Sequence, residues 1–313
     1  MPVSLPTPTA APTAPPTPRV RPAPTPVAPT PVSSSPRTVT LAQLAPTPRS
    51  TPLVVVHVPP LGTLLSGALP AADADYGLVV EDVASGARVG MNERRVFPSA
   101  SLYKLAVAWE VLRRADEGAM NLDEPLQITD EDAVEPEPYG GVASGQAPSL
   151  REALDAMLTV SSNAAAHALL RVLGRHEFNA AMGQLGLGDT RVPEDSAADD
   201  PQSDAQAVTS AADMAHLLSL IAHNQMLTAA SHDDLMRLMA SGGPPDALRD
   251  TLPDSVDVYD KTGNLPDASN VTALLQTGRG MVVLVVLDEG VNPGDARGVI
   301  AQLGQAAYDA VLR

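Results

Sequence analysis

Along residues 61–313, the apolar residues follow two kinds of pattern. In some segments they recur with a period of two residues, and in others with a period near 3.6. The two-residue period predicts a hairpin over 76–93 that turns at Ala84, Ser85 and Gly86. Near the other end of the chain, three segments separated by turns that contain glycine are also predicted to be strands. These strands cover residues 256–263, 270–278 and 281–290.

The helical periodicity is found in the middle of the chain. Apolar residues recur there at positions i, i+3 and i+4, as expected of amphipathic helices, and Ser210 with Asp213 forms a predicted capping box. The predicted helices cover residues 101–117, 149–160, 162–173, 176–185, 210–223 and 231–240.

Two more helices are expected at the ends of this region, a short one over 61–69 and a closing one over 293–313 with Pro293 near its start. Because strands occur at both ends and helices between them, we expect one antiparallel sheet that is completed when the chain returns from a helical insertion. The predicted fold class over residues 61–313 is therefore α+β, an antiparallel sheet flanked by terminal helices with an inserted all-helical lobe.

Composition separates residues 1–60 from this domain. They hold 18 of the 31 prolines and no Asp or Glu, so we expect a disordered Pro/Thr-rich tail or linker. Neither a signal peptide nor an apolar run of membrane-spanning length is visible in the sequence. A stalk of this kind suits a periplasmic or extracellular protein whose signal a misplaced start codon could hide. A cytoplasmic protein with a disordered tail is the alternative.

Charge and residue content exclude several functions. All 37 acidic residues lie in 61–313, and phosphate binding needs a basic face, so no nucleic-acid partner is expected. The absence of cysteine excludes disulfides and thiol catalysis. The six histidines show neither a His-x-x-x-His nor a His-Glu-x-x-His arrangement, so no metal and no cofactor are expected.

The chain has two lysines, Lys104 and Lys261, against 18 arginines. Lys104 follows Ser101 by three residues at the start of a predicted helix, so both side chains share one helix face. The apolar neighbours of Lys104 favour a neutral amine that can take the proton of Ser101. Taken alone, such a pair is more often a capping serine and a lysine whose stem lies along apolar surface.

Two other short motifs accompany this pair. Lys261-Thr262-Gly263 ends a predicted strand, where an ammonium, a hydroxyl and an accessible backbone can hold an extended substrate that carries a carboxylate. Ser161-Ser162-Asn163 falls at the junction of two predicted buried helices, where Ser161 could pass a proton and Asn163 could hold Lys104. The alternatives are an ordinary polar strand end and a helix N-cap.

Ser-x-x-Lys, Ser-x-Asn and Lys-Thr-Gly in this order, in a sheet split by a helical lobe, resemble the motifs of the serine β-lactamase and penicillin-binding protein superfamily. The flanking residues FPSASLYK and LTVSSNAAAHALL are most similar to class A β-lactamases. The likeness covers about residues 61 to 313 and does not extend to the tail.

The resemblance implies catalytic functions for three residues. Ser101 would be the acylated nucleophile, Lys104 its base, and Ser161 the relay that carries a proton to the leaving nitrogen.

It also implies a set of substrate-binding residues. Asn163 would orient the substrate amide, Lys261 and Thr262 would bind its carboxylate at the Lys-Thr-Gly strand that includes Gly263, and the N–H groups of Ser101 and Asn264 would form the oxyanion hole.

Two departures from the class A pattern stand out. The middle residue of the second motif, usually Asp, is Ser162. The Ω-loop of class A enzymes carries a glutamate in a Glu-x-x-Leu-Asn context that activates the deacylating water, and RVPEDSAADDPQSDAQ lacks the Leu-Asn. Glu194 is the best candidate for this base and Asp195 the next, while a solvated acidic loop is the alternative.

Three functions stay open. The class A-like flanks favour hydrolysis of the cyclic amide of β-lactams through acylation at Ser101. The Ω-loop departure and the stalk favour a penicillin-binding D-alanyl-D-alanine peptidase, or a related serine hydrolase, that acts on peptidoglycan peptides. A sensor that is acylated by β-lactams without turnover is the third. In each case the partner is a small molecule or short peptide, and we expect a monomer.

Overall fold

The computed structural model describes residues 61–70, 75–137, 139–194, 206–241 and 247–312. The proline-rich tract over 1–60 and the alternative base Asp195 lie outside the described residues. Among those that are described, no helix combines the length and the apolar character needed to cross a bilayer.

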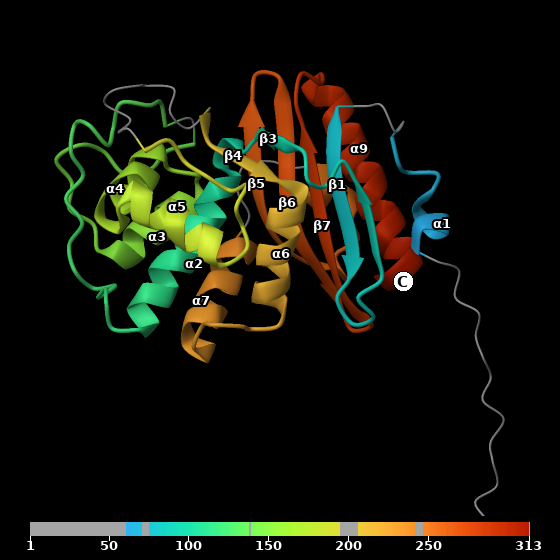
Figure 1. Cartoon of the computed structure of the whole chain (residues 1–313), viewed down its shortest axis with the longest axis horizontal. Coiled ribbons are helices and arrows are strands. Elements are labelled where there is room, and N and C mark those ends of the chain that lie inside the picture. Colours follow the sequence, from blue (N-terminus) through green and yellow to red (C-terminus); the bar gives the residue numbers. More distant parts are fainter. Residues whose placement is uncertain (1–60, 71–74, 138, 195–205, 242–246, 313) are drawn as a thin grey trace, which may run out of the picture. The chain divides into compact units, whose positions relative to one another are not determined.

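Five strands form one antiparallel sheet in the order β2-β1-β7-β6-β5, and the predicted fold class is confirmed (Figure 1). The strands are β1 Tyr76–Asp82, β2 Arg88–Met91, β5 Asp257–Leu265, β6 Ala268–Thr277 and β7 Gly280–Asp288. β1 pairs with β7 from Tyr76 opposite Asp288 to Asp82 opposite Val282. The chain therefore completes its sheet on returning from the helical insertion.

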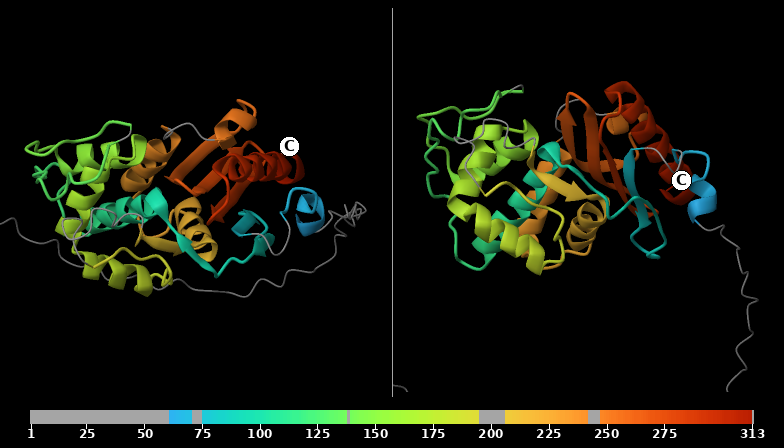
Figure 2. Two further views of the ribbon diagram at one scale, coloured as in Figure 1. Left: turned by 90° about the horizontal axis from the view of Figure 1, so that it is seen from above. Right: turned by 45° about the horizontal axis from the view of Figure 1, so that its top comes forward.

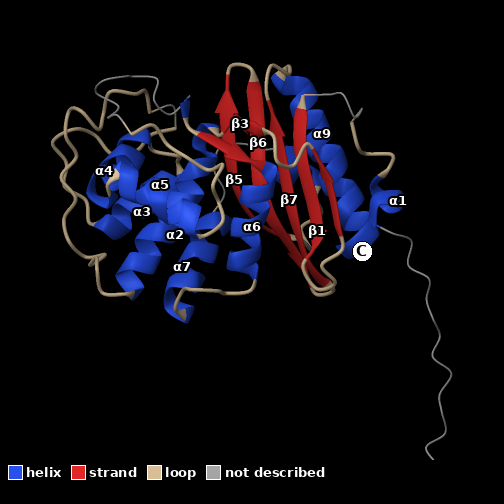
Figure 3. Ribbon diagram, in the orientation of Figure 1, coloured by secondary structure: helices blue, strands red, loops and turns tan. Residues whose placement is uncertain are grey.

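The sheet is buried on both faces, which explains the unbroken apolar run of β7. Successive side chains of a strand point to opposite faces. Leu284 packs in a cluster with α9 (Pro293–Ala307), whereas its neighbour Val285 packs in the cluster of the helical lobe. Helices thus cover both faces of the sheet (Figure 3). The face toward α9 also carries α1 Leu61–Leu65 and α8 Ala247–Thr251.

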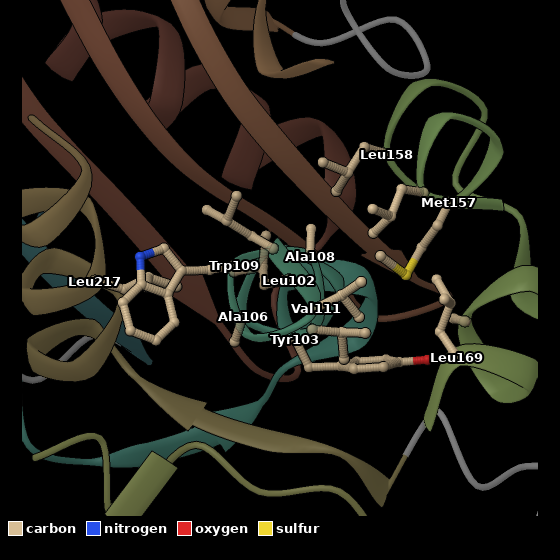
Figure 4. Packing of buried hydrophobic residues seen from close by; sticks show 14 of the residues in the cluster. Leu102, Tyr103, Ala106, Ala108, Trp109, Val111, Met157, Leu158, Leu169 and Leu217 are labelled. Atoms are coloured by element: carbon tan, nitrogen blue, oxygen red, sulfur yellow. The ribbon is translucent and has the colours of Figure 1, made fainter. Parts of the chain in front are cut away.

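The helical lobe surrounds one central helix, α2, which Figure 2 shows from two further directions. The helices of the lobe are α2 Tyr103–Asp116, α3 Leu150–Thr159, α4 Asn163–Leu173, α5 Arg175–Gln184, α6 Ala211–Ala222 and α7 Ala229–Ala240. Every residue of α2 from Tyr103 to Leu112 is buried. Trp109 lies beside Leu217 of α6, while Met157 of α3 and Leu169 of α4 approach α2 from another side (Figure 4). Because side chains pack against α2 on all sides, the residues at its N-terminus are held in a defined position.

Two short strands were not predicted. β3 (Val96–Pro98) pairs with β4 (Val208–Ser210), and this ribbon leads directly to Ser101. Strands of three residues are too short to show a period, and their pairing joins segments more than a hundred residues apart.

The predicted capping box at Ser210 is half formed. The Ser210 hydroxyl accepts a hydrogen bond from the N–H of Asp213, but the Asp213 carboxylate accepts instead from Asp189 N and Thr190 Oγ1. A partner from outside the helix has therefore replaced the expected one. A complete capping box joins Ser149 and Glu152 at the start of α3.

Candidate active site

Ser101 lies in a short 3₁₀ turn, Ala100–Leu102, that runs directly into α2. The buried hydroxyl of Ser99 accepts a hydrogen bond from Tyr103 N at 2.9 Å and so caps the start of the helix. Ala100 has a φ of 46°, a left-handed conformation that is strained for a residue with a Cβ. The turn thus presents Ser101 at the positive end of the helix dipole of α2.

Lys104 occupies the first turn of α2, and its side chain is fully buried. Its Nζ donates to the backbone oxygen of Ser161 at 2.9 Å and makes a short hydrogen bond to Asn163 Oδ1. The structure therefore brings the first and second motifs together across 57 residues of sequence.

The second motif forms the corner between α3 and α4. Ser161 is buried and left-handed, with a φ of 57°, and Ser162 caps α4 by accepting from Ala165 N at 3.2 Å. Asn163 is the first residue of α4. The left-handed turn points the carbonyl oxygen of Ser161 at Lys104, and its hydroxyl toward β5.

Lys261 reaches the same corner from β5. Its buried Nζ donates to Ser161 Oγ at 3.1 Å and to Thr262 O at 2.8 Å. Ser161 therefore stands between the two lysines of the chain, accepting from Lys104 through its carbonyl oxygen and from Lys261 through its hydroxyl.

Electrostatics couple the two lysines. Burial, and secondly the charge of Lys104, lower the pKa of Lys261 to about 7, although the carboxylate of Asp260 opposes this shift. The lowered pKa makes Lys261 partly neutral near neutral pH, so it can exchange a proton with the Ser161 hydroxyl to which it donates.

Gly263 brings β5 up to the nucleophile. A Cβ on Gly263 would lie 2.9 Å from Ser99 O, 3.0 Å from the Cβ of Ala100 and 3.1 Å from Ser101 N. Only a glycine allows this approach without displacing backbone.

Thr262 and Asn264 lie on the other face of β5 from Lys261 and Gly263, since strand residues alternate. The Thr262 hydroxyl is buried and makes no hydrogen bond to any residue that the structure describes. A small cavity adjoins Thr262, Asn264 and the exposed Arg297 of α9. The sequence analysis missed Arg297, because an arginine on an amphipathic helix carries no sign that it faces a strand end.

Glu194 is exposed, and its carboxylate lies 3.2 Å from His176 Nδ1 of α5. It lines a surface cavity with His167, Arg175 and His176. Arg175 holds the adjacent backbone by donating to Pro193 O at 3.2 Å. The described contacts of Glu194 are thus with α5, and its assignment as the deacylation base stays a prediction.

Glu137 was also missed by the sequence analysis. It comes from the connection between α2 and α3, and its carboxylate accepts hydrogen bonds at the start of α4 from Ser162, Asn163 and Ala164. The segment VEPEPYGG that carries it reads as a polar turn, so no local signal distinguishes this glutamate from its neighbours.

Comparison with known proteins agrees with this geometry. The sequence model that describes the β-lactamase enzyme family matches residues 63–311 of this chain. The structure of an ancestral class A β-lactamase, of the last common ancestor of Gram-negative bacteria, is 30% identical, with a TM-score of 0.68 over 80% of this chain and 99% of that one. A β-lactamase from Xanthomonas campestris pv. campestris is 25% identical, with a TM-score of 0.66 over 80% and 95% of the two chains.

The structure of PBP-A shares the fold at 22% identity, with a TM-score of 0.71 over 80% of this chain and 94% of that one. The family match spans the sheet, the helical lobe and all three motifs. This chain therefore belongs to the β-lactamase enzyme family, within the serine β-lactamase and penicillin-binding protein superfamily.

Proposed function

We propose that this protein is a serine hydrolase that is acylated at Ser101 and hydrolyses the cyclic amide of β-lactams. The observation that carries the proposal is the hydrogen bonding of Ser161 to both lysines, next to the turn that presents Ser101. An uncharged lysine and a relaying hydroxyl are the groups that a serine needs to form and resolve a tetrahedral intermediate.

In acylation, the Ser101 Oγ–H bond breaks as its proton passes to the amine of Lys104, and the oxygen forms a bond to the lactam carbonyl carbon. The C–N bond of the lactam then breaks, and Ser161 delivers a proton to the departing nitrogen. Lys261 replaces this proton, because its Nζ donates to the Ser161 hydroxyl. Within the lysine pair, Lys104 thus gains the proton of Ser101 while Lys261 gives one up.

Substrate binding uses the strand edge. The approach of Gly263 to Ser101 N supports an oxyanion hole made by the N–H groups of Ser101 and Asn264, each worth about 10²–10³ in rate. Because β5 is an edge strand of the sheet, a substrate carboxylate at this edge would meet Lys261 from one face and Thr262, beside Arg297 as a further cation, from the other. Asn163 would orient the substrate amide while it holds Lys104.

Deacylation needs a water activated by a base, and we assign that base to Glu194, with Asp195 as the next candidate. The acyl ester is then cleaved by water, which returns the proton to Ser101 and releases the opened lactam as a carboxylic acid. A hydrolase of this kind would act outside the cytoplasm, in the periplasm or beyond the cell.

A D-alanyl-D-alanine peptidase is the second candidate. The pairing of the exposed Glu194 with His176 favours it, because a glutamate engaged there is not free to activate water at an acyl-enzyme.

The test is incubation of the full chain with a chromogenic β-lactam, followed by absorbance and by the intact mass of the protein. Sustained colour with little mass increase is the expected result. One equivalent of colour with a stable adduct at Ser101 would favour the peptidase or a sensor. No colour and no adduct would overturn acylation by β-lactams.

Glu194→Gln tests the assigned base. If Glu194 activates the water, this variant accumulates the adduct at Ser101 and loses turnover, while its acylation rate stays close to that of the wild type. Glu177→Gln, at another acidic side chain of the same surface cavity, is the matched control and should leave turnover unchanged. Full hydrolysis by Glu194→Gln would remove Glu194 from the mechanism.

A further inference from the structure

The second motif of this chain lacks a carboxylate, because Ser162 stands where the class A pattern usually has Asp. The corner that this motif forms between α3 and α4 nevertheless contacts a carboxylate, that of Glu137. The Oε1 atom of Glu137 accepts from Ser162 Oγ at 2.9 Å and from Ala164 N at 2.7 Å, and its Oε2 atom accepts from Asn163 N at 3.1 Å. The carboxylate therefore reaches this helix terminus from 25 residues upstream.

The same segment also sets the orientation of the Asn163 side chain. Asn163 Nδ2 donates to Pro136 O at 2.9 Å, which leaves Oδ1 of the same amide directed at Lys104. Pro136 and Glu137 thus hold both the backbone and the side chain of the residue that binds Lys104. An amide released from Pro136 could rotate and present its NH₂ group to the ammonium, which would be repulsive.

Ser162 has no hydrogen-bonding capacity left for another partner. Its hydroxyl donates to Glu137 and accepts from Ala165 N at 3.2 Å and from Val142 N at 3.4 Å. Gly141 makes this arrangement possible, since a Cβ there would lie 2.6 Å from Ser162 Oγ and 2.8 Å from Glu137 Oε2. The loop is therefore closely fitted to the corner.

A carboxylate at this point suits its surroundings. It lies at the N-terminus of α4, where the helix dipole favours negative charge, and next to the residues that hold two buried lysines. Charged hydrogen bonds to backbone N–H groups are stronger than neutral ones, so Glu137 restrains the backbone more firmly than the Ser162 hydroxyl can by itself.

We propose that Glu137 is a positioning residue that supplies from the preceding loop the carboxylate missing from the second motif, and so holds Asn163 and Ser161 in place for Lys104 and Lys261. This inference rests on the proposed function for its effect on catalysis. Its effect on the geometry of the lysines is independent of any substrate.

The test compares Glu137→Ala, Glu137→Gln, Ser162→Asp and the double variant Glu137→Ala/Ser162→Asp in the full chain. Glu131→Ala, at an exposed carboxylate in the same α2–α3 connection, is the control. Glu137→Ala should slow adduct formation at Ser101 by about tenfold to a hundredfold at saturating β-lactam, the scale of a misplaced catalytic group. Glu137→Gln should fall between it and the wild type, because one of its two oxygens is replaced by a donor.

Restored acylation in the double variant would distinguish a positioning function of Glu137 from an effect on folding alone. In the double variant the new Asp places a carboxylate on the cap itself, so acylation should return to within about threefold of the wild type. Ser162→Asp alone sets two carboxylates side by side and should be slower than the double variant. A loss in Glu137→Ala that Ser162→Asp does not restore would assign Glu137 to folding and overturn the proposal.

A second measurement needs no substrate. Lysine labelled with ¹³C at Cε gives two signals in this chain, from Lys104 and Lys261. The Lys104 signal should move in Glu137→Ala and return in the double variant, while Glu131→Ala leaves it in place. If the wild type forms no adduct with β-lactams, the proposed function fails but this pattern still supports the positioning of Lys104. An unchanged Lys104 signal in Glu137→Ala would overturn it, whatever the activity.

Discussion

The two buried lysines end on the same serine, yet the regions that hold them are built differently. Lys261 belongs to β5, which pairs with β6 along its whole length, from Asp257 opposite Gln276 to Leu265 opposite Ala268. Lys104 instead meets the corner at the start of α4, which depends on a left-handed residue, a helix cap and a carboxylate from a distant loop. Backbone pairing therefore holds one lysine, and side-chain contacts hold the partners of the other.

The two halves of the site are therefore sensitive to different changes. A strand in a continuous ladder keeps its register when one side chain changes, so the β5 half is sensitive mainly to bulk that pushes the strand away. Backbone hydrogen bonds from Val160 and Ser162 to Ala156 O tie the corner to α3. The Asn163 amide that binds Lys104, however, is oriented by a hydrogen bond to Pro136 O, so a shift of that loop can rotate it.

The largest effect is expected from Lys104→Arg compared with Lys261→Arg. A guanidinium stays protonated and cannot accept the proton of Ser101, so Lys104→Arg should reduce acylation by about 10³-fold or more, as for a lost catalytic base. Lys261→Arg keeps the cation that binds a carboxylate and should retain more of the activity. The rate of adduct formation at Ser101, read by intact mass, measures both.

The opposite ranking would exchange the functions of the two lysines. If Lys104→Arg acylated at the wild-type rate while Lys261→Arg did not, the base would be Lys261, acting through Ser161. The melting temperature of each variant controls for loss of the fold, because both side chains are buried.

A smaller effect is expected from Gly263→Ala, which tests the strand half by bulk alone. The added methyl would meet Ser99 O and the turn that carries Ser101, so β5 must move outward and the oxyanion hole must open. We expect acylation to fall by about 10²-fold, the cost of losing one oxyanion donor. Gly278→Ala is the matched control, since nothing lies within 4 Å of a Cβ there. Equal acylation rates in the two variants would show that the approach of β5 at Gly263 has no catalytic importance.

The smallest effect is a pH dependence of stability that comes from Lys261. Its folded pKa, about 7, is below the unfolded lysine value of about 10.4. Between these values the unfolded chain binds a proton that the folded chain does not, so the free energy of unfolding should rise with pH by up to about 1.4 kcal/mol per unit. Lys261→Met should remove this slope, measured by denaturant unfolding between pH 7 and 10. An unchanged slope would mean that Lys261 stays charged in the folded protein.

Much of the fold could be predicted, because its signals are local and repeated. The apolar run of β7, bounded by glycine-containing turns, and the helical spacing of α2 to α7 extend over enough residues to be recognised. β3 and β4 could not be predicted, since three residues have no period and their pairing depends on the rest of the fold. The start of α2 at Tyr103, two residues after the predicted start, follows from the 3₁₀ turn Ala100–Leu102 that precedes it, where Ser99 Oγ accepts a hydrogen bond from Tyr103 N.

The site divides in the same way. Ser101, Lys104 and Lys261 could be identified because two rare lysines sit in short motifs with a chemical reason for their spacing. Glu137 and Arg297 could not, because glutamate in a polar turn and arginine on an amphipathic helix are ordinary residues until the fold brings them to α4 and β5.

The periodic elements and the three motifs could be read from the sequence alone, since each depends on residues a few positions apart. The order of these elements along the chain then predicted that the sheet closes around a helical insertion. The tertiary structure decided that Ser161 joins both lysines, that Thr262 faces away from Lys261, and that Glu137 caps the second motif. Those relations depend on a left-handed turn, on strand direction and on contacts across 25 to 100 residues. Local spacing cannot encode them, because hydrogen bonds form between atoms that only the packing of the whole domain brings within reach.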